Sequence, residues 1–393
     1  MSNPVICSIA RTPIGRFNGA FSSLSAMDLG GIAIAAALER AGLDGGQVDE
    51  VIFGHVLQAG QGQITARQAA VNGGIPMTVP AMTINKVCLS GMTAIAEACR
   101  RIRLGEASFV VAGGMESMTN APHVLPHART GVGYGDATLV DVLTHDGLFC
   151  AFDGCLMGES SDHKNTDLGI DREVQDAWAA RSHQRVESAV ESGAFDGEIV
   201  PVSVPQRRGD PIEVSVDEGY RPGMTVEKLA SLRAAFVNEG TITAGNASQI
   251  SDGAAALVVA DRSAAEDAGL PIVAEILGYG QTAGPDATLQ ERPAEAIRIA
   301  AGVAGVAVAD IDLFEFNEAF ASVSYWAGVQ LGVSEDIINV NGGAVALGHP
   351  LGATGARIVV TLINALRKRG GGIGGAALCG GGGQGDGLVV GTV

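Results

Sequence analysis

Short apolar runs alternate with amphipathic segments near both ends of the chain. Residues 51–54 and 109–112 form apolar runs of the length of buried strands, and residues 29–38 repeat apolar side chains at helical spacing. Gly42 follows that helical segment and is expected to close it. In the last third of the chain the pattern predicts strands at 272–279, 311–316, 337–340, 375–379 and 387–391, and helices at 293–303, 318–331 and 353–369. Such alternation favours α/β layers with largely parallel sheets.

The two ends of the chain repeat one pattern. A predicted helix at 91–103 leads to the apolar run at 109–112 and then to Gly113 and Gly114. The helix at 353–369 leads likewise to a strand and then to the run Gly380–Gly383. The repeat indicates an internal duplication. We therefore expect one half to comprise residues 1–120 with 250–270, and the other to comprise residues 271–393.

The middle of the chain, residues 121–249, has a different composition. It holds more charge and proline and fewer strand signals than the two ends. Its pattern predicts an exposed helix at Asp171–Ser192 and a hairpin or loop at Val200–Val216. We interpret it as an inserted loop domain over the site that carries substrate contacts, because loops often do so. A plain structural elaboration is the alternative.

Composition limits the class of protein. The chain of 393 residues is longer than a single core usually serves, and it is 47% hydrophobic and 17% charged. A net charge of −18 argues against nucleic-acid binding, which needs a basic surface. The six cysteines show neither disulfide-framework nor CxxC spacing, and no apolar run reaches the roughly 18 residues of a membrane span. We expect a cytoplasmic protein without a membrane anchor.

Cys88 stands where an extended segment turns into a helix. The segment behind it carries apolar residues on one helical face. A thiol at a helix N-terminus meets unpaired backbone N–H groups, which favour the thiolate that attacks carbonyls. The pattern therefore predicts a nucleophile with a lowered pKa. A buried packing cysteine is the alternative.

Three other residues lie at predicted strand or helix ends. Asn317 lies between a strand and a helix, His349 precedes a proline and a glycine-rich helix, and Cys379 precedes four glycines. Singly, they fit a helix cap, a core histidine and a packing cysteine. Together with Cys88 they form a set of two thiols, an imidazole and an amide. The ends of strands in α/β sheets are where sites are built.

Six short motifs in order give the chain a specific resemblance. They are Asn85-Lys86-Val87-Cys88 with Ser90-Gly91, Gly113-Gly114-Met115-Glu116-Ser117-Met118, Thr243-Ala244-Gly245-Asn246-Ala247-Ser248, Asn317-Glu318-Ala319-Phe320, Gly348-His349-Pro350 and Cys379-Gly380-Gly381-Gly382. Over essentially its whole length the chain resembles the thiolase family, and within it most closely the acetyl-CoA acetyltransferases. The resemblance implies a thiolase-like α/β fold: two similar βαβ-type halves stacked in layers, with an inserted loop domain.

The resemblance also implies a reaction and roles. Two acetyl-CoA would give acetoacetyl-CoA and CoA, reversibly, through an acyl group on Cys88. His349 would take the Cys88 proton, and Cys379 would move the proton alpha to the second thioester. One oxyanion would meet His349 and a water held by Asn317, and the other the backbone N–H groups of Cys88 and Gly381. No cofactor is implied, since coenzyme A and acetyl-CoA are substrates.

Further positions match coenzyme A contacts of the family. Arg221 and Ser248 match contacts to coenzyme A, and Met157 matches a pantetheine-lining position. The chain departs from the family pattern at Leu89, Leu156, Gln249 and Gly380. These departures remove no catalytic group but leave the acyl chain length open.

Other functions remain open from the sequence. A 3-ketoacyl-CoA thiolase of fatty-acid or aromatic-acid breakdown would use the same residues, and a non-catalytic thiolase-like binding protein would lack the intact set. Ketoacyl synthases usually carry a second histidine where this chain has Cys379. A metal role for His123 and His127 lacks a third ligand nearby. By resemblance we expect a homo-oligomer, a tetramer or a dimer.

Overall fold

The computed structural model describes residues 4–392. The N-terminal part forms β1 (Pro4–Arg11), β2 (Gly15–Arg16), α1 (Ala26–Ala41), η1 (Gly45–Gln47), β3 (Glu50–Gly54), α2 (Thr65–Asn72), β4 (Ala81–Ile84), α3 (Ser90–Arg103) and β5 (Phe109–Ser117). After the middle segment the chain returns to the N-terminal part and adds β12 (Ser251–Asp261) and α7 (Arg262–Asp267). The C-terminal part forms β13 (Ala274–Ala283), α8 (Arg292–Ala304), η4 (Val308–Asp310), β14 (Leu313–Phe316), α9 (Ala321–Leu331), η5 (Glu335–Ile337), α10 (Ala344–Leu347), α11 (Leu351–Lys368), β15 (Gly372–Gly380) and β16 (Gln384–Thr392).

One large mixed sheet joins both parts. Its strand order is β14-β15-β16-β13-β1-β12-β5-β3-β4, with β2 on β12. The pairs from β5 through β12, β1, β13 and β16 to β15 are antiparallel, and only the outer pairs β3–β4, β3–β5 and β14–β15 are parallel. The expectation of largely parallel sheets was therefore wrong. Strands β15 and β16 follow each other through a short turn, and such a connection allows only antiparallel pairing.

The strand order repeats on both sides of the β1–β13 contact. The N-terminal order β4-β3-β5-β12-β1 corresponds to a C-terminal order in which Ile338, β14, β15, β16 and β13 follow. The predicted strand at 337–340 is reduced to one bridge between Ile338 and Phe314. Asn339 next to it adopts a left-handed φ of 47°, and its side chain bonds both backbone groups of Phe316. The chain turns there instead of extending, so this predicted strand does not form.

Helices α3 and α11 lie side by side against the sheet and share one core with it. Two glycines permit their close approach. A Cβ on Gly91 would lie 2.8 Å from the backbone nitrogen of Ala356, and one on Gly355 would lie 2.4 Å from that of Met92. Side chains at either position would push the helices apart. Because Cys88 precedes α3 and His349 precedes α11, this packing brings the two residues together.

The remaining faces of the sheet are covered by other helices. Helices α1 and α2 cover the N-terminal part, and α8 and α9 cover the C-terminal part. Helix α1 begins with a capping box at Ser25 and ends at Gly42, whose φ of 69° is left-handed. The prediction that Gly42 closes this helix is confirmed.

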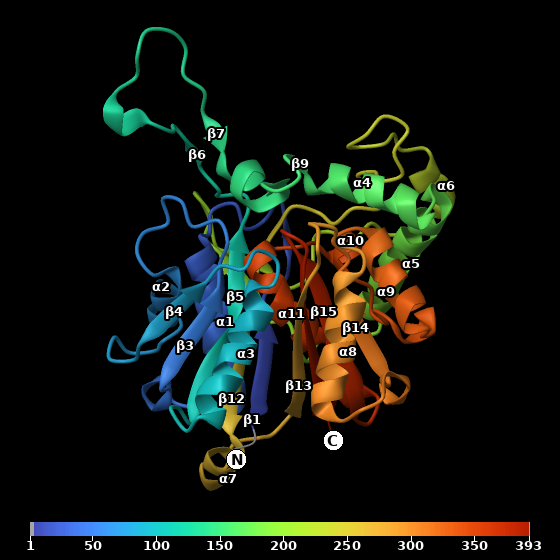
Figure 1. Ribbon diagram of the computed structural model, residues 1–393. Coiled ribbons are helices and arrows are strands. Elements are labelled where there is room, and N and C mark those ends of the chain that lie inside the picture. Colours follow the sequence, from blue (N-terminus) through green and yellow to red (C-terminus); the bar gives the residue numbers. More distant parts are fainter. Residues whose placement is uncertain (1–3, 393) are drawn as a thin grey trace.

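The middle segment forms several small elements. They are β6 (His123–Val124), η2 (Ala128–Thr130), β7 (Val140–Asp141), η3 (Leu143–Leu148), β8 (Phe149–Cys150), β9 (Cys155–Leu156), α4 (Met157–Leu168), α5 (Arg172–Glu191), β10 (Val202–Val204), β11 (Ile212–Val214) and α6 (Val226–Ala230). In Figure 1 the arm with β6 and β7 rises at the upper left, and α4, α5 and α6 lie at the upper right. The middle segment therefore lies over the edge of the sheet at which the C-terminal end of β5 is found (Figure 1). Strands β10 and β11 form the predicted hairpin.

Helix α5 is not the exposed helix that its charge suggested. Trp178, Ala179, His183 and Val186 are buried along one face, which packs against α6, α9 and α10. A helix with a charged outer face still needs an apolar inner face to pack against the protein. In α5 the inner residues are mostly small and widely spaced, so the sequence pattern does not reveal that face.

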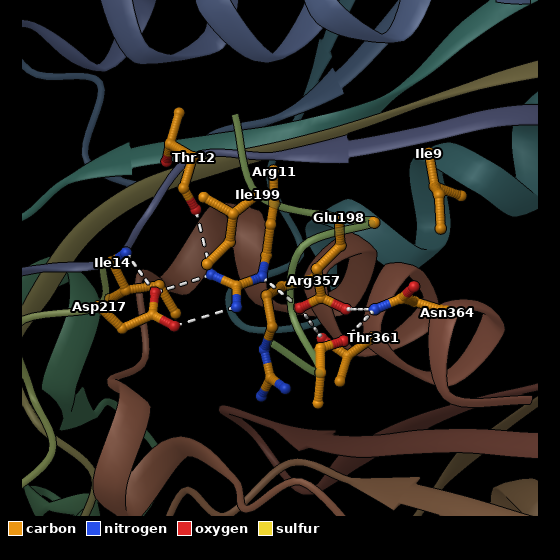
Figure 2. Close-up of polar contacts among 12 residues, drawn as sticks. Ile9, Arg11, Thr12, Ile14, Glu198, Ile199, Asp217, Arg357, Thr361 and Asn364 are labelled. Atoms are coloured by element: carbon orange, nitrogen blue, oxygen red, sulfur yellow. Dashed lines mark hydrogen bonds and ion pairs between the residues drawn. The ribbon is translucent and has the colours of Figure 1, made fainter. Parts of the chain in front are cut away.

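A buried ionic cluster fixes the middle segment to both parts of the body (Figure 2). The guanidinium of Arg11, on β1, bonds Glu198 at 2.6 Å and Asp217 at 2.7 and 3.0 Å. Thr361 and Asn364, on α11, each donate to Glu198 at 3.0 Å. All five side chains are buried. Since such charges are costly without their partners, the cluster specifies how these segments meet. Within the described residues, no helix is long and apolar enough to cross a membrane.

Candidate active site

A cavity of about 860 Å³ opens between the two parts of the body and the middle segment. Cys88, His349 and Cys379 all contribute to its wall, although they are far apart in the sequence. The rest of the wall is mainly apolar and includes Met118, Leu143, Leu148, Leu156, Phe236, Ile250, Leu289, Phe320 and Leu351. An apolar cavity with a few converging reactive groups is the usual form of a small-molecule site.

Cys88 sits on a tight turn just before α3. Val87 has a left-handed φ of 49°, which is rare for a β-branched residue. The hydroxyl of Ser90 accepts from the Lys86 N–H at 2.9 Å and donates to the Val87 carbonyl at 2.6 Å. The side chain of Asn85 accepts from the Val87 N–H at 3.1 Å. These bonds hold the turn that directs the Cys88 sulfur into the cavity.

His349 faces Cys88 through one ring nitrogen and Thr354 through the other. Its Nε2 lies 3.3 Å from the Cys88 Sγ, and its Nδ1 lies 2.7 Å from the Thr354 Oγ1. The Thr354 hydroxyl donates its only proton to the Pro350 carbonyl at 2.8 Å. It must therefore accept from Nδ1–H, which leaves the Nε2 lone pair free to take the Cys88 proton.

Burial keeps this pair neutral. Burial raises the pKa of the Cys88 thiol to about 12, although the backbone N–H groups of Cys88 and Gly381 act in the opposite direction. Burial, followed by the charge of Arg357, lowers the pKa of His349 to about 3. The expectation of a lowered thiol pKa is wrong for this site, because desolvation outweighs the helix N-terminus. Cys88 thus keeps its proton beside an imidazole nitrogen that can accept it.

Cys379 is the last residue but one of β15 and lines the same cavity. Burial and the nearby Cys88 raise the pKa of its thiol. The backbone N–H of Gly381 lies near the Cys88 sulfur and lowers the pKa of that thiol. The glycine turn after β15 therefore brings both a second thiol and a hydrogen-bond donor to Cys88.

Asn317 follows β14 and contacts His349. Its Nδ2 lies 3.4 Å from the His349 Nε2. Its Oδ1 is buried and accepts no hydrogen bond from the described residues. Helix α9 begins only at Ala321 with Phe320 as its cap, so Asn317 is not a helix cap. A buried amide with a free acceptor beside an imidazole is suited to hold a small polar molecule.

The residues matched to coenzyme A contacts divide into two groups. Met157, at the start of α4, and Ser248 line the cavity. Arg221 is exposed and is not part of the cavity wall, and its backbone N–H donates to Nδ1 of His183 at 3.1 Å.

The contacts of Glu116 beside the site were not predicted from the sequence. Buried Glu116 accepts from the N–H groups of Val56 and Leu57, both at 3.1 Å, and of Gly352 at 2.9 Å. The Nε2 of His55 lies 3.2 Å from its Oε1. Glu116 therefore ties the start of α11, and so His349, to the N-terminal part. The one sequence feature that could have pointed to Glu116 is its position in the motif Gly113-Gly114-Met115-Glu116-Ser117-Met118. Among residues 4–392, no three His, Cys, Asp or Glu side chains gather as a metal site.

Comparison with known proteins agrees with the geometry. The family descriptions "Thiolase, N-terminal domain" and "Thiolase, C-terminal domain" match residues 4–263 and 270–392. A probable acetyl-CoA acetyltransferase of Mycolicibacterium smegmatis is 52% identical over 98% of this chain and 100% of its own. The acetyl-CoA acetyltransferases of Escherichia coli and Pseudomonas aeruginosa are 49% and 47% identical over 99% of both chains. The chain therefore belongs to the thiolase family.

Proposed function

We propose that this protein is an acetyl-CoA C-acetyltransferase, an acyltransferase that joins two acetyl-CoA into acetoacetyl-CoA and CoA and also runs in reverse. The observation that carries the proposal is the 3.3 Å contact between Cys88 Sγ and the unprotonated Nε2 of His349, with Cys379 on the same cavity wall. Family membership and the names of relatives at 45–52% identity support the same activity.

The first step acylates Cys88. His349 Nε2 takes the thiol proton as the Cys88 sulfur attacks the acetyl-CoA carbonyl. The developing oxyanion faces the backbone N–H groups of Cys88 and Gly381, which lie near the sulfur and favour negative charge there. When the carbon–sulfur bond to CoA breaks, Cys379 gives its proton to the departing thiolate. A neutral thiol at this position, as its raised pKa provides, is what this step requires.

The second step joins two carbons. Cys379, now a thiolate, removes the proton alpha to the carbonyl of a second acetyl-CoA. The carbanion attacks the acetyl group on Cys88, and the leaving sulfur recovers its proton from His349. Asn317 and His349 would face the enolate oxygen of the second substrate, with the free Oδ1 of Asn317 as the anchor for a water. Protons and charge balance over the cycle, and each residue returns to its starting state.

The finer features of the proposal rest on the family resemblance. Coenzyme A and acetyl-CoA act as substrates, with no further cofactor, and Met157, Ser248 and Arg221 contact coenzyme A. The chain divides into residues 1–120 with 250–270, a loop domain at 121–249, and residues 271–393. The protein acts in the cytoplasm, in lipid metabolism, as a homotetramer or dimer. Light scattering during size-exclusion chromatography measures the oligomeric state.

Two measurements test the function. Acetyl-CoA should add one acetyl group to the wild-type protein and none to Cys88→Ala, as read by intact mass. Labelling of another residue would reject Cys88 as the nucleophile. CoA-dependent thiolysis should show its highest kcat/KM with acetoacetyl-CoA among 3-ketoacyl-CoA substrates. Equal or higher values with longer chains would instead indicate a 3-ketoacyl-CoA thiolase of a degradative route, and no thiolysis by folded protein would reject the enzyme.

A further inference from the structure

A buried ion pair joins the nucleophile turn to the other part of the molecule. The ammonium of Lys86, two residues before Cys88, lies 2.7 Å from the Asp386 carboxylate on β16. The Asp386 side chain is fully buried and that of Lys86 is 15% exposed. A pair so sheltered from water is screened little, and each partner is costly to leave alone.

Two further donors reach the same carboxylate. The hydroxyl of Thr93, in the first turns of α3, donates to Asp386 at 2.8 Å. The Tyr279 hydroxyl, on β13, also bonds Asp386, and burial together with that negative charge raises the pKa of the phenol. Asp386 therefore gathers donors from the nucleophile turn, from the helix behind it and from the adjacent strand. The carboxylate can therefore hold these three segments together.

Asp386 is also part of the hairpin that carries the second thiol. In the β15–β16 register, Asp386 pairs with Leu378, and Gly385 pairs with Cys379. The hairpin turn contains Gly381, and a Cβ on Gly381 would lie 3.4 Å from a methyl group of Val87. The nucleophile turn and the hairpin thus come into contact near Cys88 and Cys379. The Lys86–Asp386 ion pair joins the same two segments.

The strained backbone of the nucleophile turn explains why a contact that holds the turn in place matters. A β-branched residue with a left-handed φ, as at Val87, costs on the order of 1–3 kcal/mol and persists only where the surroundings hold it. The bonds of Asn85 and Ser90 hold the turn internally. Lys86 is the residue of the turn whose side chain bonds the opposite part of the molecule.

We propose that Lys86 and Asp386 are positioning residues that set the spacing between Cys88 and the Cys379–Gly381 hairpin. Neither residue lines the cavity, and both act through the backbone segments that they join. The inference rests on the proposed function for its kinetic consequence, because thiolysis needs both sulfurs and the Gly381 N–H in register. The chemical steps alone do not identify Lys86 and Asp386, because neither residue takes part in one.

The kinetic test replaces Lys86 and keeps the carboxylate. Lys86→Met should lower kcat for acetoacetyl-CoA thiolysis by about tenfold or more while KM changes less than about twofold, because misplaced reacting groups lose rate rather than binding. Lys86→Arg, which can restore the ion pair, should recover most of the rate. Asp386→Asn, which keeps an acceptor for Thr93 and Tyr279, should resemble Lys86→Met. Arg101→Met is the matched control, since Arg101 pairs with Glu50 and Glu106 at the far end of α3.

A second measurement needs no turnover. Phenylarsine oxide joins two nearby thiols to one arsenic and releases water, so its capture rate reports the spacing of Cys88 and Cys379. The assay uses a Cys150→Ser background, because Cys150 and Cys155 face each other across β8 and β9. Lys86→Met should slow capture relative to both the background protein and Arg101→Met, with the bridged cysteines identified by peptide mass.

The outcomes separate this inference from the proposed function. If Lys86→Met lowers only the melting temperature and keeps kcat within about twofold, the pair merely stabilises the fold and the proposal is overturned. Capture as fast as in Arg101→Met overturns it as well, as does a Lys86→Arg protein as slow as Lys86→Met. Failure of the parent protein to cleave any 3-ketoacyl-CoA would reject the proposed function, and the capture rates would still decide the role of Lys86.

Discussion

Thr354 fixes the tautomer of His349, so that the ring nitrogen that faces Cys88 carries no proton. Thr354 and His349 are five positions apart, and their 2.7 Å contact places the proton on Nδ1 because the Thr354 hydroxyl is already donating to Pro350. Thr354→Val keeps the shape and removes the acceptor. We expect kcat for thiolysis to fall at least about tenfold, since the imidazole is no longer held as a base toward the thiol. Thr354→Ser should retain most activity, and equal rates for the serine and valine variants would contradict the role.

The resting state of Cys88 can be tested by alkylation. Because burial raises its pKa to about 12, the thiolate fraction of unliganded protein should keep rising through the neutral and mildly alkaline range. The rate of iodoacetamide modification at Cys88, followed by peptide mass, should then increase roughly tenfold per pH unit from pH 7 to pH 9. A plateau below about pH 8 would instead indicate a lowered pKa, as the helix N-terminus alone predicts.

Asn317 is expected to act on rate and not on folding. Asn317→Ala removes the amide beside His349, and loss of one oxyanion donor typically costs about 2.7–4 kcal/mol in the transition state. Thiolysis kcat should therefore fall by roughly 10²–10³ while the melting temperature stays close to that of the parent. Unchanged turnover would remove Asn317 from the site. The acetylation of Cys88 measured separately shows which half of the reaction depends on the amide.

Leu89 and Gly380 share one volume beside the two thiols. A Cβ on Gly380 would lie 2.6 Å from the Leu89 Cγ, and Leu89 is fully buried. Leu89→Ala should cost about 2–5 kcal/mol of unfolding free energy by leaving a cavity. Gly380→Val should cost about 1–3 kcal/mol by overpacking. The double variant should lose less than the sum, as urea unfolding would measure, and strictly additive losses would show that the two positions do not share the space.

His183 should contribute to acid sensitivity. Burial, and then the charge of Arg221, lower its pKa from 6.5 to about 4. Between these values the unfolded chain takes up the proton and the folded chain does not, so stability falls as pH falls through this window. His183→Asn keeps an acceptor for the Arg221 N–H and should flatten the loss of the urea midpoint from pH 6.5 to pH 4.5. An unchanged slope would mean that His183 does not titrate on unfolding.

Local patterns predicted most elements but not how strands pair. The strands near 51–54, 272–279 and 387–391 are present, because burial imposes apolar runs wherever a strand lies. Strand direction depends on connections that the pattern does not contain, so the antiparallel centre of the sheet was missed. The strand at 337–340 failed for a local reason: Asn339 uses its side chain to turn the backbone.

The sequence grouped the four candidate residues correctly in space but not in their chemistry. Cys88, His349, Asn317 and Cys379 do lie together, since each stands at the end of a strand or helix that meets the same cavity or, for Asn317, contacts His349. The protonation of Cys88 was mispredicted because desolvation depends on how many segments enclose a group, which no single motif reveals. Asp386 acts across a long sequence distance, and its partners Lys86 and Thr93 become visible only once the sheet is assembled.

The repeated strand order has a consequence for how such a protein originates. Cys88 and His349 occupy equivalent places in the two parts, each just before the helix that packs against its counterpart. If both parts descend from one ancestral gene, a symmetric dimer of that ancestor had the same residue in both loops. Acid–base pairing between unlike residues therefore required the two copies to diverge in sequence. Neither half on its own contains a complete reaction centre, so separately expressed halves should gain activity only by reassembling.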